Sequence, residues 1–123
     1  MFYKNDIVVR SRKFVCCIVK AVERMPKGMS VFSIGKQVID SAGSVGANMV
    51  EARFGRTAKE FISSARISLK EVNETMFWLD TLNDLHLLPS EKYASLKQEA
   101  SEIAKVIAVI IKNYRKNNKA LKS

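Results

Sequence analysis

The chain has few of the residues that break or cross-link a fold. It contains two prolines, five glycines and two cysteines in 123 residues, and no stretch alternates strictly between apolar and polar side chains. Because helix-breaking proline and glycine are scarce and no strand-like alternation is present, the sequence favours helices over strands. Cys16 and Cys17 are adjacent and would point about 100° apart on a helix, so they cannot pair there. We expect both to be small core residues with free thiols, in a reducing compartment.

Further absences narrow the class of protein. No apolar run approaches the length of a membrane span, and the N-terminus lacks the apolar core of a signal peptide. His86 is the single histidine, which excludes a ferritin-like di-iron site, and the cysteine count excludes a four-ligand zinc site. No phosphate loop of recognised spacing is present, and no base accompanies Ser41 or Ser44. We expect a cytoplasmic, bacterial, non-enzymatic protein without cofactors, in which His86 ends a helix.

Positive charge is abundant and unevenly distributed. The net charge is +9 at pH 7, with +6 on residues 1–36, −2 on residues 37–111 and +5 on residues 112–123. Such segments can hold RNA or DNA phosphates, or can serve only as a solvated surface. No groove-reading motif is present, so binding would be phosphate-dominated and salt-sensitive. The candidate nucleic-acid-binding residues are Arg10, Arg12, Lys13, Lys20, Arg53, Arg56, Lys59, Arg66, Lys112, Arg115, Lys116, Lys119 and Lys122.

Apolar spacings of three, four and seven predict the first two helices. Asn5 or Asp6 can cap the first helix, and Pro26 ends it. Ser30 or Ser33 can start the second helix, whose expected inner stripe is Ile34, Val38, Ser41, Ala42, Val45, Met49 and Ala52.

Small and polar residues interrupt this second helix. Gly43 and Gly46 each cost roughly 1 kcal/mol in helix propensity relative to alanine. Close approach of a neighbouring helix would offset that cost, and a ligand site against the bare backbone is the alternative. Asn48 and Glu51 lie one turn apart, where they can satisfy the turn at Phe54 or bond to the third helix. Inter-subunit contact is the other interpretation of this pair.

The third helix carries two stripes. Thr57 and Glu60 have the form of a capping box, and the helix runs to about His86. One stripe reads Phe61, Ala65, Ser68, Val72, Thr75, Leu79 and Leu82. The other, from Ile67 to Leu85, exceeds what one bundle core requires and predicts a homo-oligomer. The expected interface residues are Asn48, Glu51, Ile67, Glu71, Glu74 and Trp78.

The fourth helix opens at Pro89-Ser90-Glu91, with Ser90 as its cap. Its heptad stripe is Tyr93, Leu96, Ala100, Ile103, Ile107, Ile110 and Tyr114. We expect the basic tail beyond Tyr114 to be frayed. Short connections make the fold an antiparallel up-down-up-down four-helix bundle, all-α and a single domain over residues 1–123.

Two E-x-x-E pairs raise the possibility of an enzyme. Paired carboxylates such as Glu71 with Glu74 and Glu99 with Glu102 can hold magnesium in nucleotide hydrolases. The helical phase argues against this, since Glu99 and Glu102 flank core positions and are expected to face solvent. A magnesium-dependent nucleotide hydrolase is therefore the least favoured function.

The ordered residues from Gln37 to Leu79 resemble a known family. They are Gln37, Ser41, Ser44-Val45-Gly46-Ala47-Asn48, Glu51-Ala52, Glu60-Phe61-Ile62, Ile67, Leu69-Lys70-Glu71, Glu74-Thr75 and Trp78-Leu79. This set is similar to the bacterial four-helix-bundle family of 23S rRNA-intervening sequence proteins, over about residues 5–115. One departure is Asp40, where relatives often carry an arginine, so a partner contact that depends on that arginine is not expected of this chain.

The resemblance implies properties that composition does not. Relatives form pentameric rings, and a related branch serves as the accessory protein of diversity-generating retroelements, in contact with a reverse transcriptase and nucleic acid. For most members no biochemical activity is established. We therefore expect a homopentamer that associates with RNA or DNA through basic surfaces. The alternative is a protein–protein adaptor, such as a reverse-transcriptase accessory factor.

Overall fold

Residues 6–122 of the computed structural model form four α-helices, and that range contains no strand. The helices are α1 (Ile7–Glu23), α2 (Met29–Arg53), α3 (Ala58–Asp84) and α4 (Ser90–Lys122). Side chains are described as far as residue 118. The prediction of an all-α fold with four helices is confirmed.

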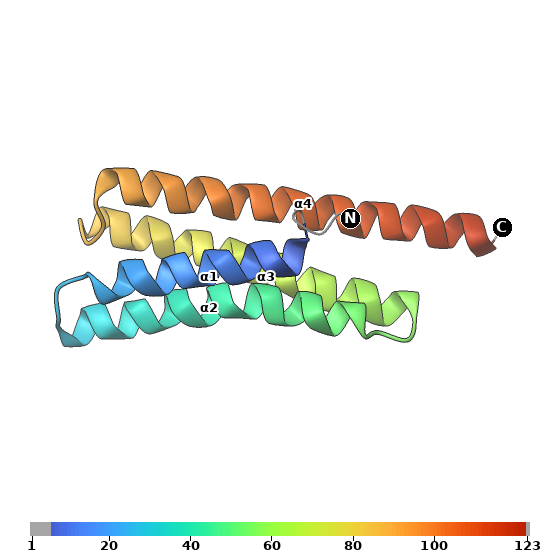
Figure 1. Ribbon diagram of the computed structural model, residues 1–123, viewed down its shortest axis with the longest axis horizontal. Helices are drawn as coiled ribbons and strands as arrows, with labels where there is room; N and C mark the ends of the chain where they lie inside the picture. Colours follow the sequence, from blue (N-terminus) through green and yellow to red (C-terminus); the bar gives the residue numbers. More distant parts are fainter. Residues whose placement is uncertain (1–5, 123) are drawn as a thin grey trace.

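Each helix packs against its neighbours in the chain, and α4 returns against α1 to close a four-helix bundle (Figure 1). Within the described range, the diagonal pairs α1–α3 and α2–α4 do not pack together. Short turns between successive helices produce this antiparallel order. Because α1 has 17 residues and α4 has 33, the end of α4 and the α2–α3 turn extend together past the start of α1 (Figure 1).

The first two helices begin differently. Asp6 caps α1 as predicted, and its carboxylate accepts a hydrogen bond of 2.8 Å from a backbone amide of the first turn. α2 begins at Met29, directly after Gly28, and no side chain caps it. The prediction that Ser30 or Ser33 starts α2 is therefore wrong. The carbonyl of Gly28 already accepts a helical hydrogen bond of 2.9 Å, so the helix begins before either serine.

Thr57 caps α3 as the capping box predicts. Its hydroxyl oxygen accepts a hydrogen bond of 3.1 Å from the amide of Glu60. The carboxylate of Glu60 accepts one of 2.9 Å from the amide of Arg56, one residue earlier than the usual return bond. Both interactions satisfy donors at the start of the helix.

The end of α3 contains a left-handed residue that the sequence did not indicate. His86 has φ of 56°, and its amide donates to the carbonyl of Asn83 at 3.0 Å. The amide of Leu87 donates to the carbonyl of Leu82, also at 3.0 Å. These two bonds form a Schellman motif, in which glycine usually takes the place of His86. His86 thus ends the helix, as expected, but through its backbone conformation.

Buried hydroxyl groups fix the register of α2 against α3. Ser68 Oγ donates to the carbonyl of Val45 at 2.6 Å, and Thr75 Oγ1 donates to Ser41 Oγ at 2.9 Å. The predicted inner stripes of α2 and α3 are confirmed, except that Ile34 and Phe61 are half-buried. In α4 the buried apolar residues within the described side chains are Leu96, Ala100, Ile103, Ile107 and Ile111.

Two local expectations need correction. Cys16 and Cys17 are both exposed and are not core residues, because the buried stripe of α1 passes through Phe14 and Ile18 instead. α4 is helical as far as Lys122, past the point at which we expected fraying.

The two α2 glycines differ in their surroundings. A Cβ at Gly46 would lie 3.2 Å from Ser11 Cβ, so α1 does approach closely there, as predicted. A Cβ at Gly43 would meet only an ordinary contact of 3.9 Å with Val15. Intrachain packing therefore accounts for Gly46 and leaves Gly43 without an explanation.

Candidate nucleic-acid and self-association surfaces

A groove between the start of α3 and the end of α4 gathers four of the candidate cations. Its lining includes Lys59, Lys112, Arg115 and Lys116, and it encloses a volume of about 710 Å³. Beside it, the rings of Phe61 and Tyr114 stack with centroids 3.9 Å apart and nearly parallel planes. This stack holds the two basic helix ends together.

The same positive surface continues along both helices. Arg66 and Lys70 follow Lys59 at spacings of seven and four residues, which keeps them on one side of α3. Lys105 precedes Lys112 by seven residues and so shares its side of α4. All of these side chains are exposed. We call the set the basic face; its residues are Lys59, Arg66, Lys70, Lys105, Lys112, Arg115 and Lys116.

Sequence reasoning missed two members of the basic face, Lys70 and Lys105. The antiparallel register of α3 and α4 was the missing information. It is set by the aromatic stack at one end and by Asp80 at the other, whose carboxylate accepts 2.6 Å hydrogen bonds from both Lys97 Nζ and Tyr93 OH. These bonds lower the pKa of Asp80, with Lys97 the larger cause.

Arg10 is a candidate that the structure places in an ionic cluster. Its guanidinium donates to both carboxylate oxygens of Glu99, at 2.7 and 2.8 Å, and to Glu102 at 2.7 Å. Glu99 and then Glu102 raise the pKa of Arg10. The two glutamates flank the core as expected and keep 35% and 45% of their side-chain surface exposed, but they bind Arg10 of α1 instead of pointing freely into solvent. The positive charge of Arg10 is thereby compensated.

Arg53 is the second compensated candidate. It forms an ion pair with Asp6. Desolvation alone would raise the pKa of Asp6, but the hydrogen bonds from Arg53 and the Val8 amide outweigh it and lower that pKa. Together, Arg53 and Asp6 join the end of α2 to the start of α1.

The remaining candidates do not line the groove between α3 and α4. Arg12 lines a groove between α1 and α2, and Lys13 lines one between α1 and α4. Lys20 is exposed on α1, and Arg56 is exposed in the α2–α3 turn. The side chains of Lys119 and Lys122 lie outside the described residues.

A contrasting surface lies on the side of α3 that faces away from α4. Four of the expected interface residues, spaced by four, three and four, form what we call the Trp78 stripe: Ile67, Glu71, Glu74 and Trp78. Ile67 is 44% exposed. Burial, and then the charge of Glu74, raise the pKa of Glu71. The stripe therefore combines exposed apolar surface with two repelling carboxylates.

Trp78 is half-buried, and its ring meets that of Phe77 edge-on at a centroid distance of 4.9 Å. Its Nε1 is buried and finds no hydrogen-bond partner among the described residues. An unsatisfied buried donor costs roughly 1–3 kcal/mol. Phe77 itself is 60% exposed. Aromatic surface of this kind is typical of contact regions.

Asn48 and Glu51 do not behave as the sequence suggested. Asn48 Nδ2 donates to the carbonyl of Ser44, one turn back within α2, at 2.8 Å. It bonds neither to the Phe54 turn nor to α3. Glu51 is exposed and lines a shallow depression beside that turn. Both residues stay available for inter-subunit contact.

The structure separates the two E-x-x-E pairs. Glu71 and Glu74 belong to the Trp78 stripe, whereas Glu99 and Glu102 bind Arg10. Within the described residues, no cluster of three or more His, Cys, Asp or Glu side chains is placed to hold a metal ion. A paired-carboxylate magnesium site is therefore not assembled from these four residues.

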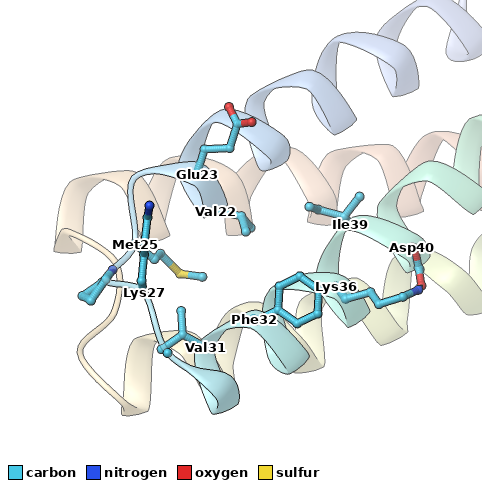
Figure 2. Close-up of a pocket in the computed structure, with 11 residues that line it drawn as sticks. Val22, Glu23, Met25, Lys27, Val31, Phe32, Lys36, Ile39 and Asp40 are labelled. Atoms are coloured by element: carbon cyan, nitrogen blue, oxygen red, sulfur yellow. The ribbon is translucent and has the colours of Figure 1, made fainter.

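An apolar cavity of about 660 Å³ lies beside the α1–α2 turn (Figure 2). Val22, Met25 and Val31 line it, and Phe32 stands at its edge with 74% of its surface exposed. Lys36 reaches Asp40 at 2.7 Å across one helical turn (Figure 2). The cavity lies at the end of the bundle opposite to the α2–α3 turn (Figure 1).

The fold and these surfaces define the class: an antiparallel four-helix bundle with a basic face and an apolar, acidic stripe on one helix. None of the helices within residues 6–122 combines the length and hydropathy needed to span a bilayer. The sequence profile of the 23S rRNA-intervening sequence protein family matches residues 3–109. The chain belongs to that family.

One solved structure gives the same result. It is the crystal structure, at 1.70 Å resolution, of a protein of unknown function from the S23 ribosomal protein family of Bacteroides thetaiotaomicron. The two chains are 33% identical, superpose with a TM-score of 0.82, and the match covers 88% of this chain and 96% of that one. No curated protein matches the chain. The relation to retroelement accessory proteins stays a prediction.

Proposed function

We propose that this protein is a non-enzymatic, self-associating bundle that holds nucleic-acid phosphates on its basic face. The observation that carries the proposal is the arrangement of seven cations on the outer side of α3 and α4. None of the seven forms an ion pair with another described residue, in contrast to Arg10 and Arg53. Uncompensated cations on one surface are what a polyanion requires.

The spacing of the cations fits a backbone contact rather than base recognition. Lys105, Lys112 and Lys116 recur every one or two turns, or about 6 to 11 Å along the α4 axis. A row of long basic side chains can follow successive phosphates without reading base edges. The proposal therefore predicts weak sequence preference and a steep dependence on salt.

The test is binding of the full chain to a structured RNA and to a DNA duplex by fluorescence anisotropy. Affinity should fall by a factor of about 10 to 1,000 between about 50 and 200 mM salt, since each neutralised phosphate contributes about −0.9 to the log–log slope on B-DNA. Absence of binding to either probe at the lower salt concentration would sink the proposal.

Self-association is the second part of the proposal, and the Trp78 stripe supports it. Exposed Ile67 shares the stripe with half-buried Trp78, whose ring meets that of exposed Phe77, on a helix that already fills its share of the core. A pentamer is the assembly that the family resemblance leads us to expect. A ring would repeat the basic face, so that weak phosphate contacts add through avidity.

Light scattering tests this part. Trp78→Glu should give monomers of the 13.8 kDa chain, and Ile67→Glu should do the same at a more exposed position. Retention of the wild-type assembly by both variants, with helical content intact, would remove the Trp78 stripe from the interface.

The cavity beside the α1–α2 turn favours an adaptor as a second candidate function. An exposed phenylalanine next to an apolar hollow offers an anchor point for a protein partner. Phe32→Ser should weaken capture of such a partner and leave nucleic-acid binding unchanged, as measured by the same anisotropy assay. Loss of RNA binding in Phe32→Ser would instead argue against a separate adaptor surface.

A further inference from the structure

The groove that Arg12 lines runs between α1 and α2, on a side of the bundle that the basic face and the Trp78 stripe do not occupy. Its volume is about 240 Å³, and its lining includes Val8, Val15, Gly43, Ala47 and Val50, with Arg12 at its edge. We call it the α1–α2 groove. Apart from Arg12, every residue named here is small or apolar.

Gly43 is the residue in this groove that the isolated chain does not explain. A Cβ there would find only ordinary contact with Val15, so α1 does not require a glycine at this position. Glycine within a helix is less favourable than alanine. Ala47, one turn later, is exposed. The two small residues leave the α2 backbone open to a helix that approaches from outside.

Arg12 supplies a positive charge at the edge of the groove, which favours an incoming helix that carries negative charge. It is exposed and forms no ion pair with another described residue. A visiting helix should therefore offer apolar surface together with a carboxylate. The Trp78 stripe has this composition, because exposed Ile67 precedes Glu71 by one turn and Glu74 by two.

We propose that the α1–α2 groove receives the Trp78 stripe of a second copy of this chain, with Arg12 facing Glu71 and Glu74 of that copy. The proposal rests on the self-association proposed above and names the surface that completes it. The groove and the stripe are different surfaces, so the contact is heterologous. In a pair of copies, one groove and one stripe stay free, and each can bind a further copy. Burial, and then the charge of Glu74, raise the pKa of Glu71 even though Lys70 partly offsets them, so the ionised carboxylate of Glu71 is unfavourable in the single chain.

Complementation between two blocked variants tests this pairing. Ala47→Trp fills the groove from an exposed position and leaves the stripe intact, whereas Ile67→Glu blocks the stripe and leaves the groove intact. Each variant alone should be monomeric by light scattering. An equimolar mixture at high concentration should contain a species of twice the monomer mass, since one intact groove meets one intact stripe. Ala108→Trp, at an exposed position on α4, is the control and should assemble as wild type does.

A charge exchange provides a second readout that does not depend on filling the groove. Arg12→Glu should weaken assembly at least several-fold, and adding Glu71→Arg to the same chain should restore it, because every contact then pairs the exchanged charges.

The outcomes separate the two proposals. A monomeric wild type would overturn self-association, and the groove pairing with it. An assembled wild type with an unaffected Ala47→Trp variant, or a variant mixture that stays monomeric, would overturn the groove pairing alone. Failure of the exchanged charges to restore assembly would count against the Arg12 contact in the same way.

Discussion

The two outer sides of α3 differ in nearly every respect. Toward α4, Lys59, Arg66 and Lys70 belong to a surface of cations that form no ion pair with another described residue. Toward α2, Ile67, Glu71 and Trp78 form an apolar, acidic stripe, in which the buried Nε1 of Trp78 has no hydrogen-bond partner among the described residues. One helix thus presents a surface suited to a polyanion and another suited to a protein. The contrast teaches that the net charge of a chain is a poor guide to where it binds a partner. Whether each charged side chain already has an ion-pair partner is a better guide.

The largest effect should come from reversing charges on the basic face. The triple variant Lys59→Glu, Lys112→Glu and Lys116→Glu should lose roughly 100-fold in affinity for structured RNA at low salt, because three phosphate contacts become repulsive. Fluorescence anisotropy measures the change.

A matched control reverses two cations on α1 and the one at its C-cap: Lys13→Glu, Lys20→Glu and Arg24→Glu. It changes the net charge by the same amount and should lose far less affinity. Equal losses in the two triple variants would mean that binding responds to overall charge and not to the basic face.

Compensated cations should show the opposite behaviour. Arg10→Met should lower the free energy of unfolding by roughly 1 kcal/mol, because the two-bond pair between Arg10 and the partly exposed Glu99 is lost. RNA affinity should change little. Urea denaturation measures the stability, and Lys36→Met, which breaks an exposed pair within one helix, should cost only about 0.3–0.5 kcal/mol. A stable Arg10→Met variant that no longer binds RNA would reverse the roles assigned to paired and free cations.

The turn after α3 offers a change that touches neither surface. His86→Gly should raise the free energy of unfolding by about 1 kcal/mol, since glycine accepts a φ of 56° without a Cβ clash. His86→Ala retains the Cβ and should bring no such gain. Thermal denaturation of both variants measures the difference, and an equal gain in both would argue against backbone strain at this position.

The smallest effects should be pH-dependent changes in the free energy of unfolding, with opposite signs for Glu71 and Asp80 on the two sides of α3. The folded pKa of Glu71 is raised, so its unfavourable charge appears as pH rises through that value, and Glu71→Gln should gain roughly 0.5 kcal/mol at neutral pH. The folded pKa of Asp80 is lowered, so its favourable charge is lost as pH falls through that value, and Asp80→Asn should lose a similar amount at neutral pH.

Both differences should vanish in strong acid, where each carboxyl group is protonated whether the chain is folded or unfolded. Urea titrations at neutral and acidic pH check both signs. A loss of stability in Glu71→Gln at neutral pH would contradict the repulsion between Glu71 and Glu74.

The sequence predicted the helices and their buried stripes because apolar spacing in a bundle is a local signal. Ala65, Val72 and Leu79 could be assigned to the core from their positions in one helix alone. The charge pairs could not be assigned in this way. Arg10 and Glu99 are 89 residues apart, and their contact depends on the register of α1 against α4.

The same limit explains the errors at local positions. Cys16 and Cys17 sit among apolar residues, yet the buried stripe of α1 turns away from both of them. Gly43 and Gly46 look equivalent in sequence, but only Gly46 lies against α1. Spacing alone places Lys70 on the side of α3 that carries Lys59 and Lys105 on the side of α4 that carries Lys112, but the union of these two sides in one basic face depends on the packing of α3 against α4. These features depend on how the helices pack against one another, and one amino-acid sequence does not give the distances between helices.

Mapping the RNA contact tests the central assignment most directly. Photo-cross-linking of the wild-type protein to a thiouridine-substituted structured RNA, followed by mass spectrometry of the cross-linked peptides, locates the bound surface. The prediction is that cross-links concentrate in residues 58–70 of α3 and residues 104–118 of α4. Cross-links that instead concentrate on α1, or on the side of α3 that carries Trp78, would contradict it.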